Sequence, residues 1–181
     1  LGHNKLAKIV KSSSSTINLK PVNGLSIFAV SGGLPLEKRS AQRQNYRMRE
    51  LKRWSQHLNI PIKLKPKFFP YDSTLASAII IVVTDDNIQS GMRITEKIMK
   101  ACWQQDLNMA SPKDLLKLLE NENLNSREIL ELAQSDSAQE RYASYTKEAI
   151  GNGVFGVPTY MYNHEIFWGQ DRLEFLQEKL K

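Results

Sequence analysis

The spacing of apolar residues predicts that most of the chain is helical. Between Ser40 and Leu58, apolar side chains recur every three or four positions, and basic side chains occupy most of the remaining ones. Ser111 precedes a proline and a first-turn acid, which is typical of a helix start. We expect helices from Leu1 into the serines at 12–15, from Ser40 to Leu58, from Ser111 onward, from Ser126 to Gln134 and from Ser137 to Ile150.

Two regions have the shorter period of strands. The segment 16–22 (TINLKPV) reads as a short strand near the start. Near the end, 159–162 and 165–168 flank Asn163-His164 and predict a β-hairpin, followed by a last helix that begins near Gln170. The apolar run from Leu75 is too short for periodicity to separate a helix from a buried strand.

This order of elements suggests an α/β unit that is split by a helical insertion. We assign residues 1–24 and 151–181 to the α/β domain and residues 25–150 to an inserted, all-helical domain. The length of 181 residues and the 41% hydrophobic content suit one domain that carries an insertion.

Cysteine and charge limit the chemistry. The lone Cys102 excludes an internal disulfide and a C-x-x-C pair within these residues, and it favours a reducing compartment. No spacing of His or Cys predicts a metal site, and the run from Leu75 is too short to cross a bilayer. The net charge of +6 would suit nucleic acid, a membrane surface or an anionic ligand, and charge alone does not choose among them.

The basic stretch 38–67 is interpreted as a solvated helix face rather than a nucleic-acid site. Trp54 falls on the apolar face with Leu51 and Leu58, which places it in the core instead of on a base-stacking surface. We therefore expect no nucleic-acid partner.

The step Val157-Pro158-Thr159 is the first candidate for a binding site. A proline between a glycine-rich approach and a hairpin favours a cis peptide bond, which leaves the Val157 backbone free to pair with a peptide-like ligand. Asp171 is the second candidate. Its carboxylate either caps the last helix or meets a ligand ammonium, and the spacing alone leaves both readings open.

Longer motifs carry a family resemblance. The segment GVFGVPTYMYNHEIFWGQDRLEFL, which begins at Gly153, resembles the C-terminal signature of the 2-hydroxychromene-2-carboxylate isomerase family. This family shares its fold with kappa-class glutathione S-transferases and DsbA thiol oxidoreductases. The similarity continues upstream through GGLPLEKRSAQRQNYRMRELKRW, FFPYDSTLAS and KACWQQ, so it covers nearly the whole chain.

The resemblance implies a thioredoxin-like fold with an all-helical insertion, of which the N-terminal strand is missing from this sequence. The family's catalytic serine lies in a stretch whose end resembles Leu1-Gly2, so we expect that serine upstream of Leu1. In the family, glutathione lies along the residue before a cis-proline and its γ-glutamyl end meets the turn into the last helix. The corresponding residues here are Val157, Pro158, Gly169, Gln170 and Asp171.

Tyr46 and Asp72 are the expected substrate-binding residues by the same resemblance. Asp72 stands where many relatives carry Asn, and a carboxylate beside an anionic substrate is unfavourable unless nearby Lys or Arg offsets it.

The implied activity is a glutathione-dependent isomerisation of 2-hydroxychromene-2-carboxylate-like aromatic catabolites, or a kappa-like glutathione transfer. In that family chemistry, the thiolate adds to a conjugated substrate, permits rotation about a former double bond and leaves. Two alternatives remain open: a DsbA-like oxidoreductase with C-x-x-C upstream of Leu1, and a non-catalytic binding protein. We expect a cytoplasmic homodimer with a small aromatic substrate and no membrane partner.

Overall fold

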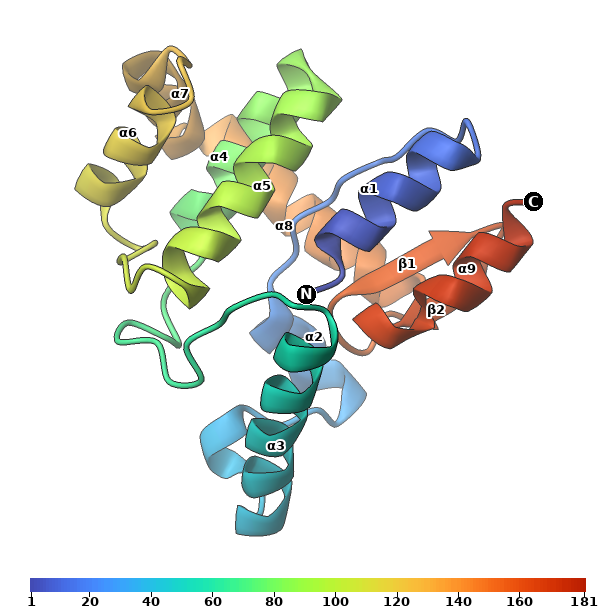
Figure 1. Ribbon diagram of the computed structural model, residues 1–181. Helices are drawn as coiled ribbons and strands as arrows, with labels where there is room; N and C mark the ends of the chain where they lie inside the picture. The colour runs from blue at the N-terminus through green and yellow to red at the C-terminus, as the bar shows by residue number, and fades with distance from the viewer. The chain divides into compact units, whose positions relative to one another are not determined.

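The computed structural model describes all of residues 1–181 (Figure 1). The chain folds into two compact units. The first unit comprises Leu1–Ile17, Gly24–Ile60 and Lys147–Lys181. The second unit comprises Asn18–Asn23 and Pro61–Thr146.

The first unit contains a two-stranded sheet and the helices of both chain ends. Its elements are α1 (His3–Ser12), α2 (Gly24–Ser31), the 3-10 helix η1 (Leu36–Lys38), α3 (Ala41–His57), β1 (Thr159–Tyr162), β2 (Glu165–Trp168), the 3-10 helix η2 (Gln170–Arg172) and α9 (Leu173–Lys179).

The second unit is entirely helical. Its elements are α4 (Thr74–Asp86), α5 (Ile88–Trp103), α6 (Pro112–Glu120), α7 (Ser126–Gln134) and α8 (Asp136–Gly151). The end of α8, from Lys147 onward, belongs to the first unit.

The hairpin forms where the sequence predicts it. Strands β1 and β2 pair antiparallel with Tyr160 opposite Phe167, and Asn163 and His164 both have the positive φ that a two-residue type I′ turn requires. Ile9 of α1 and Leu173 and Leu176 of α9 pack with Phe167 in a small core. The sheet is therefore anchored to both terminal helices.

Local capping signals also place the helices correctly. The Ser40 hydroxyl accepts a hydrogen bond from the Arg43 amide, and the Ser111 hydroxyl accepts one from the Asp114 amide. The apolar run from Leu75 forms α4, which is buried at seven positions on several sides. A helix without a polar face suits the centre of the helical unit, where neighbours cover it all round.

The predicted strand over 16–22 is wrong. Residues 15–23 have no regular secondary structure, because a strand needs a neighbour to pair with and none lies alongside. Leu19 packs instead against the core of the second unit, and the Asn23 amide donates to the Thr146 hydroxyl at 3.0 Å.

The two units differ from the domain boundaries predicted at 24/25 and 150/151. Residues 24–60 group with the first unit rather than with the helical insertion. Within this segment Ile27 of α2 is completely buried, and the Ser31 hydroxyl donates to the Phe155 carbonyl at 3.3 Å. These contacts join α2 to the chain just before Val157.

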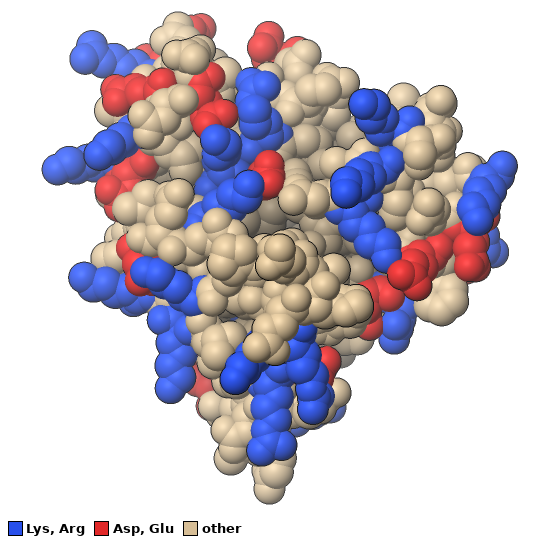
Figure 2. All heavy atoms as spheres, viewed as in Figure 1, with Lys and Arg blue, Asp and Glu red and all other residues tan.

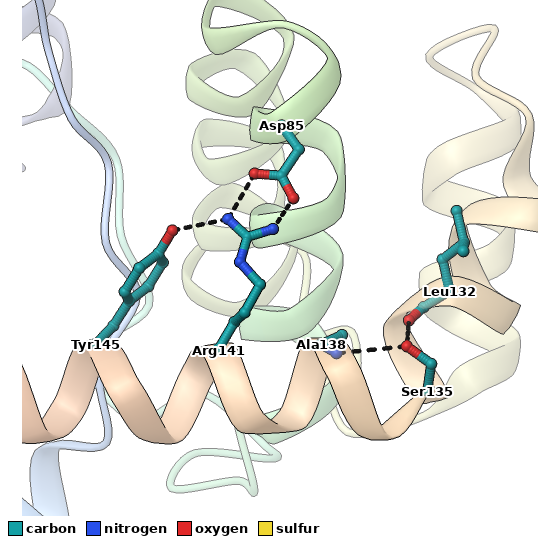
Figure 3. A network of polar contacts seen from close by, with 6 residues as sticks. All are labelled: Asp85, Leu132, Ser135, Ala138, Arg141 and Tyr145. Atoms are coloured by element: carbon teal, nitrogen blue, oxygen red, sulfur yellow. Dashed lines mark hydrogen bonds and ion pairs between the residues drawn. The ribbon is translucent and has the colours of Figure 1, made fainter.

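A polar network joins α4 to α8 within the second unit (Figure 3). Both Arg141 guanidinium nitrogens Nη1 and Nη2 donate to the Asp85 carboxylate, and Nη2 also contacts the Tyr145 hydroxyl at 2.9 Å. At the start of α8, the Ser135 hydroxyl donates to the Leu132 carbonyl and accepts from the Ala138 amide. The ion pair between Arg141 and Asp85 holds α8 against α4. The two hydrogen bonds of Ser135 cap the junction of α7 and α8.

We expect Arg141→Met to lower the free energy of unfolding by only about 0.5 to 1 kcal/mol, because both partners of the ion pair are partly exposed and water screens them. Tyr145→Phe, which removes one hydroxyl from the network, is the milder control. Urea unfolding measures both variants. A loss well above 2 kcal/mol for Arg141→Met would show that the clamp is buried in solution.

Candidate functional site

The segment before β1 presents an unpaired backbone. The Val157-Pro158 peptide bond is cis, as the sequence predicts, and the Val157 side chain is 49% exposed. On either side the chain is fixed: the Thr159 hydroxyl donates to the Gly156 carbonyl at 2.6 Å, and the Gly169 amide donates to the Pro158 carbonyl at 2.9 Å. The N-H and C=O of Val157 itself have no partner within the chain. They are available to an extended ligand.

The turn after β2 brings a carboxylate back over the backbone. Gly169 has φ +106°, a conformation that favours glycine, and a Cβ built on it would lie 2.5 Å from Asp171 Oδ1. Asp171 lies in η2, the 3-10 turn that leads into α9, and its Oδ2 pairs with Arg172 Nη1 at 2.9 Å. This ion pair is exposed, so it can yield to a ligand at little cost.

The start of α1 lies against this turn. A Cβ built on Gly2 would lie 2.9 Å from Gln170 Cβ and 3.0 Å from the Tyr160 hydroxyl. Burial raises the pKa of Tyr160 to about 12, so its hydroxyl stays neutral at physiological pH. The first residues of the chain therefore meet β1 and the turn at Gln170 in one place.

Two aromatic rings that the sequence analysis did not single out lie beside the segment just before Val157. The rings of Phe155 and Trp168 lie 4.9 Å apart between centroids, and the Trp168 indole packs closely over Gly156. Both side chains are about half exposed. The only sequence signal for this contact is the position of the two rings in the family motif, because Phe155 precedes β1 and Trp168 ends β2, so the hairpin separates them in sequence.

The structure brings together the five residues of the predicted glutathione site. The Gly169 amide donates a hydrogen bond to the Pro158 carbonyl, and Val157, Gln170 and Asp171 adjoin these two residues in the chain. Tyr46 lies on α3, is 60% exposed and borders a surface hollow of about 420 Å³ with Gln42, Asn45 and Arg49. None of the predicted glutathione-site residues lines that hollow.

Asp72 belongs to the second unit. Its Oδ1 accepts hydrogen bonds from the amide and the hydroxyl of Thr74 at 2.9 and 2.6 Å, and the hydroxyl bond, followed by the amide bond, lowers the pKa of the carboxyl. Asp72 is thus held as an anion at the start of α4. An Asn side chain could accept the same two bonds without the charge.

The environment of Cys102 does not suit a nucleophile. It is 2% exposed in the core of the second unit, and burial, followed by the Asp106 carboxylate, raises the pKa of the thiol to about 11. No cluster of three His, Cys, Asp or Glu side chains is arranged to hold a metal ion. None of the helices combines the length and the apolar content that crossing a bilayer requires.

We expect Cys102 in the folded protein to react with a thiol reagent at pH 8 about a hundredfold more slowly than an unperturbed cysteine, because a pKa raised from 9.0 to about 11 leaves about a hundredfold less thiolate. The rate should rise with pH up to about 11. Absorbance after addition of a chromogenic disulfide, with denatured protein as the control, measures it. Rapid stoichiometric labelling of the folded protein at pH 7 would contradict the burial.

Basic side chains crowd α3, over which Figure 2 shows a cluster of Lys and Arg. Segment 37–53 holds seven basic and two acidic residues, and so carries most of the chain's net charge of +6. Met48, Leu51 and Trp54 are partly buried, as expected for the inner face. The positive face points to water.

From this arrangement we expect DNA binding to be weak and to disappear as salt rises, because it would rest on phosphate contacts alone. Fluorescence anisotropy with two unrelated duplexes, at low and at physiological salt, checks this. Tight, sequence-selective binding at physiological salt would show that α3 reads bases.

Comparisons with known proteins agree with this geometry. A protein-family model, the DSBA-like thioredoxin domain, matches residues 1–181. A 2-hydroxychromene-2-carboxylate isomerase of Sphingobium xenophagum is 23% identical over 97% of this chain and 88% of its own length. The isomerase of the same name from Pseudomonas putida is 26% identical over 99% of this chain and 87% of its own length.

A solved structure of a 2-hydroxychromene-2-carboxylate isomerase superposes with a TM-score of 0.78 at 22% identity, and the match covers 99% of this chain and 86% of that one. The predicted thioredoxin-like fold with a helical insertion is confirmed, as is the resemblance to these isomerases.

Proposed function

Because the chain belongs to the DSBA-like thioredoxin domain family, we propose that it is a glutathione-dependent isomerase of 2-hydroxychromene-2-carboxylate-like aromatic compounds. The observation that carries the proposal is the unpaired backbone of Val157, which is an exposed residue. Its neighbour Pro158 accepts a hydrogen bond from the Gly169 amide, at the turn that holds Asp171. The curated relatives named as isomerases supply the reaction class.

The residues present fit glutathione, which is an extended peptide with a charged α-amino acid end. The free N-H and C=O of Val157 suit its peptide backbone, as an added strand would. The Asp171 carboxylate suits the ammonium of the γ-glutamyl group, and Gln170 lies beside it with polar side-chain atoms. This assignment follows the family resemblance, and the geometry supports it.

When bound, glutathione would supply a thiol that adds reversibly to a conjugated double bond and so allows rotation about it. The part of this chain is to bind and orient. Val157 would hold the backbone of the peptide and Asp171 its γ-glutamyl end, and the half-exposed Phe155 and Trp168 rings lie beside the segment just before Val157. Gly2 lies against Gln170 at this site.

A DsbA-like oxidoreductase is the rival activity. It would need a C-x-x-C upstream of Leu1, since Cys102 is buried and its raised pKa disfavours the thiolate. A kappa-like transferase would use the same glutathione site with a different electrophile. We further propose a cytoplasmic location, which suits a chain with one buried cysteine.

An activity assay separates these functions. Full-length protein, dialysed free of thiols, is mixed with 2-hydroxychromene-2-carboxylate with and without glutathione, and the isomerisation is followed by absorbance. We expect turnover only with glutathione. Parallel assays measure insulin disulfide reduction and glutathione conjugation to a model electrophile. Disulfide reduction without isomerisation would support the oxidoreductase. An isomerisation rate that is the same with and without glutathione would overturn the proposal.

A further inference from the structure

One face of α2 lies against the segment just before β1. Gly24, Phe28 and Ser31 are spaced four and three residues apart, so they share this face of the helix. A Cβ built on Gly24 would lie 3.9 Å from Val157 Cγ2. The Ser31 hydroxyl donates to the Phe155 carbonyl at 3.3 Å. Phe28, which stands between these two contacts on the same face, is therefore beside the proposed glutathione site.

A guanidinium group is held over the Phe28 ring. Arg39 Cζ lies 5.9 Å from the centroid of this ring, and Arg39 Nε donates to the Leu34 carbonyl at 2.7 Å. The ring packs against Gly33, where a Cβ would not fit, and both Phe28 and Arg39 are only partly exposed. The ring and the carbonyl thus fix the plane of the guanidinium. Its terminal nitrogens Nη1 and Nη2 have no acceptor within the chain.

Arg47 adds a second positive charge at this place. Gln44 Nε2 donates to the Arg39 carbonyl at 2.8 Å, and Gln44 and Arg47, three residues apart, are neighbours on one face of α3. Burial, followed by the charge of Arg39, lowers the pKa of Arg47, so the two guanidinium groups are close enough to repel each other. An anion bound beside both groups would relieve that repulsion.

We propose that Arg39, supported by Arg47, binds the carboxylate of the aromatic substrate and so orients the substrate beside glutathione. The two terminal nitrogens of a fixed guanidinium match the two oxygens of a carboxylate. Leu25, which is 64% exposed three residues before Phe28, extends the apolar surface on which an aromatic ring can lie. The glycine carboxylate of glutathione carries no such ring. This inference rests on the proposed function, because it states how that function's substrate is recognised.

Calorimetric titration of the full-length protein, in the presence of glutathione, tests the site with an unreactive pair of probes. The probes are 2-naphthoate and its neutral counterpart 2-naphthamide. We expect the unaltered protein to bind the acid about ten- to a hundredfold more tightly than the amide, as a charged two-point contact would require. Arg39→Gln should abolish this preference. Arg39→Lys, which keeps the charge but loses the planar fork, should retain part of it.

Arg53→Gln is the matched control, because Arg53 is an exposed base of the same helix that pairs with Glu50. This variant should keep the full preference for the acid. Equal binding of acid and amide by the unaltered protein, or equal loss of the preference in Arg39→Gln and Arg53→Gln, would overturn the carboxylate site. So would an intact preference in Arg39→Gln together with weaker glutathione binding, which would assign Arg39 to the glycine carboxylate of glutathione.

The isomerisation assay reports separately on the proposed function. A protein that prefers 2-naphthoate through Arg39 but does not isomerise 2-hydroxychromene-2-carboxylate would refute that function and still support an aromatic-acid site. A protein that isomerises the substrate with an unchanged KM in Arg39→Gln would support the function and refute the site.

Discussion

Asp171→Asn should weaken glutathione binding about ten- to a hundredfold while the fold survives. The Asn side chain keeps the size and the capping ability of Asp but removes the charge that would face the ammonium of glutathione in the proposed site, and a charge-assisted hydrogen bond contributes about 1.5 to 3 kcal/mol. Arg172, which pairs with Asp171 in the free protein at 2.9 Å, is exposed and gives up that contact at little cost. Calorimetric titration of the full-length protein measures the affinity.

Glu174→Gln is the matched control for Asp171→Asn. It removes one negative charge from the start of α9, where Glu174 pairs with Lys5 at 2.8 Å and is largely exposed. Its glutathione affinity should equal that of the unaltered protein. Unchanged affinity in Asp171→Asn would mean that Asp171 serves only the turn, and a parallel fall in melting temperature would make its role structural.

Gly91→Ala should lower the free energy of unfolding of the helical unit by about 1 to 3 kcal/mol. Gly91 is buried in α5, and a Cβ built on it would lie 2.9 Å from the Cα of Thr84 in α4. The obstacle is backbone, so no side-chain rotation relieves it and the two helices must separate. Because α4 is buried at most of its positions, that separation loosens the core of the unit.

Gly151→Ala is the matched control for Gly91→Ala. Gly151 ends α8, has no positive φ, and a Cβ there would meet nothing within 4 Å. This substitution should be neutral or slightly stabilising, since alanine favours helix. Urea unfolding followed by circular dichroism compares the two. Equal stability of both variants would show that α4 and α5 are not in close contact in solution.

Sequence alone predicted those elements whose signals are local. The serine caps at Ser40 and Ser111 and the hairpin turn at Asn163-His164 each contain the residues that fix their geometry. The strand expected at 16–22 failed because pairing depends on a neighbour that the local pattern cannot reveal. The helix α2 was missed because its residues are apolar without a clear period.

In the candidate site, too, the sequence predicted the local features but not the contacts between distant parts of the chain. The V-P-T step is local and has the cis peptide bond that the sequence indicated, and Gly169 lies in a turn, as the family resemblance implied. The contact of Gly2 with Gln170 and Tyr160, and that of Trp168 with Gly156, join distant parts of the chain, so no local pattern contains them. The assignment of the ligand came from the family motif rather than from periodicity or spacing.

The most direct measurement is an amide chemical-shift titration of the ¹⁵N-labelled full-length protein with glutathione. The Val157 amide, which has no partner within the chain, should shift saturably together with those of Gly169, Gln170 and Asp171, while the hairpin-tip amide of Asn163 stays in place. Absence of a saturable shift at Val157, or shifts confined to another part of the chain, would contradict a glutathione site at the cis-proline.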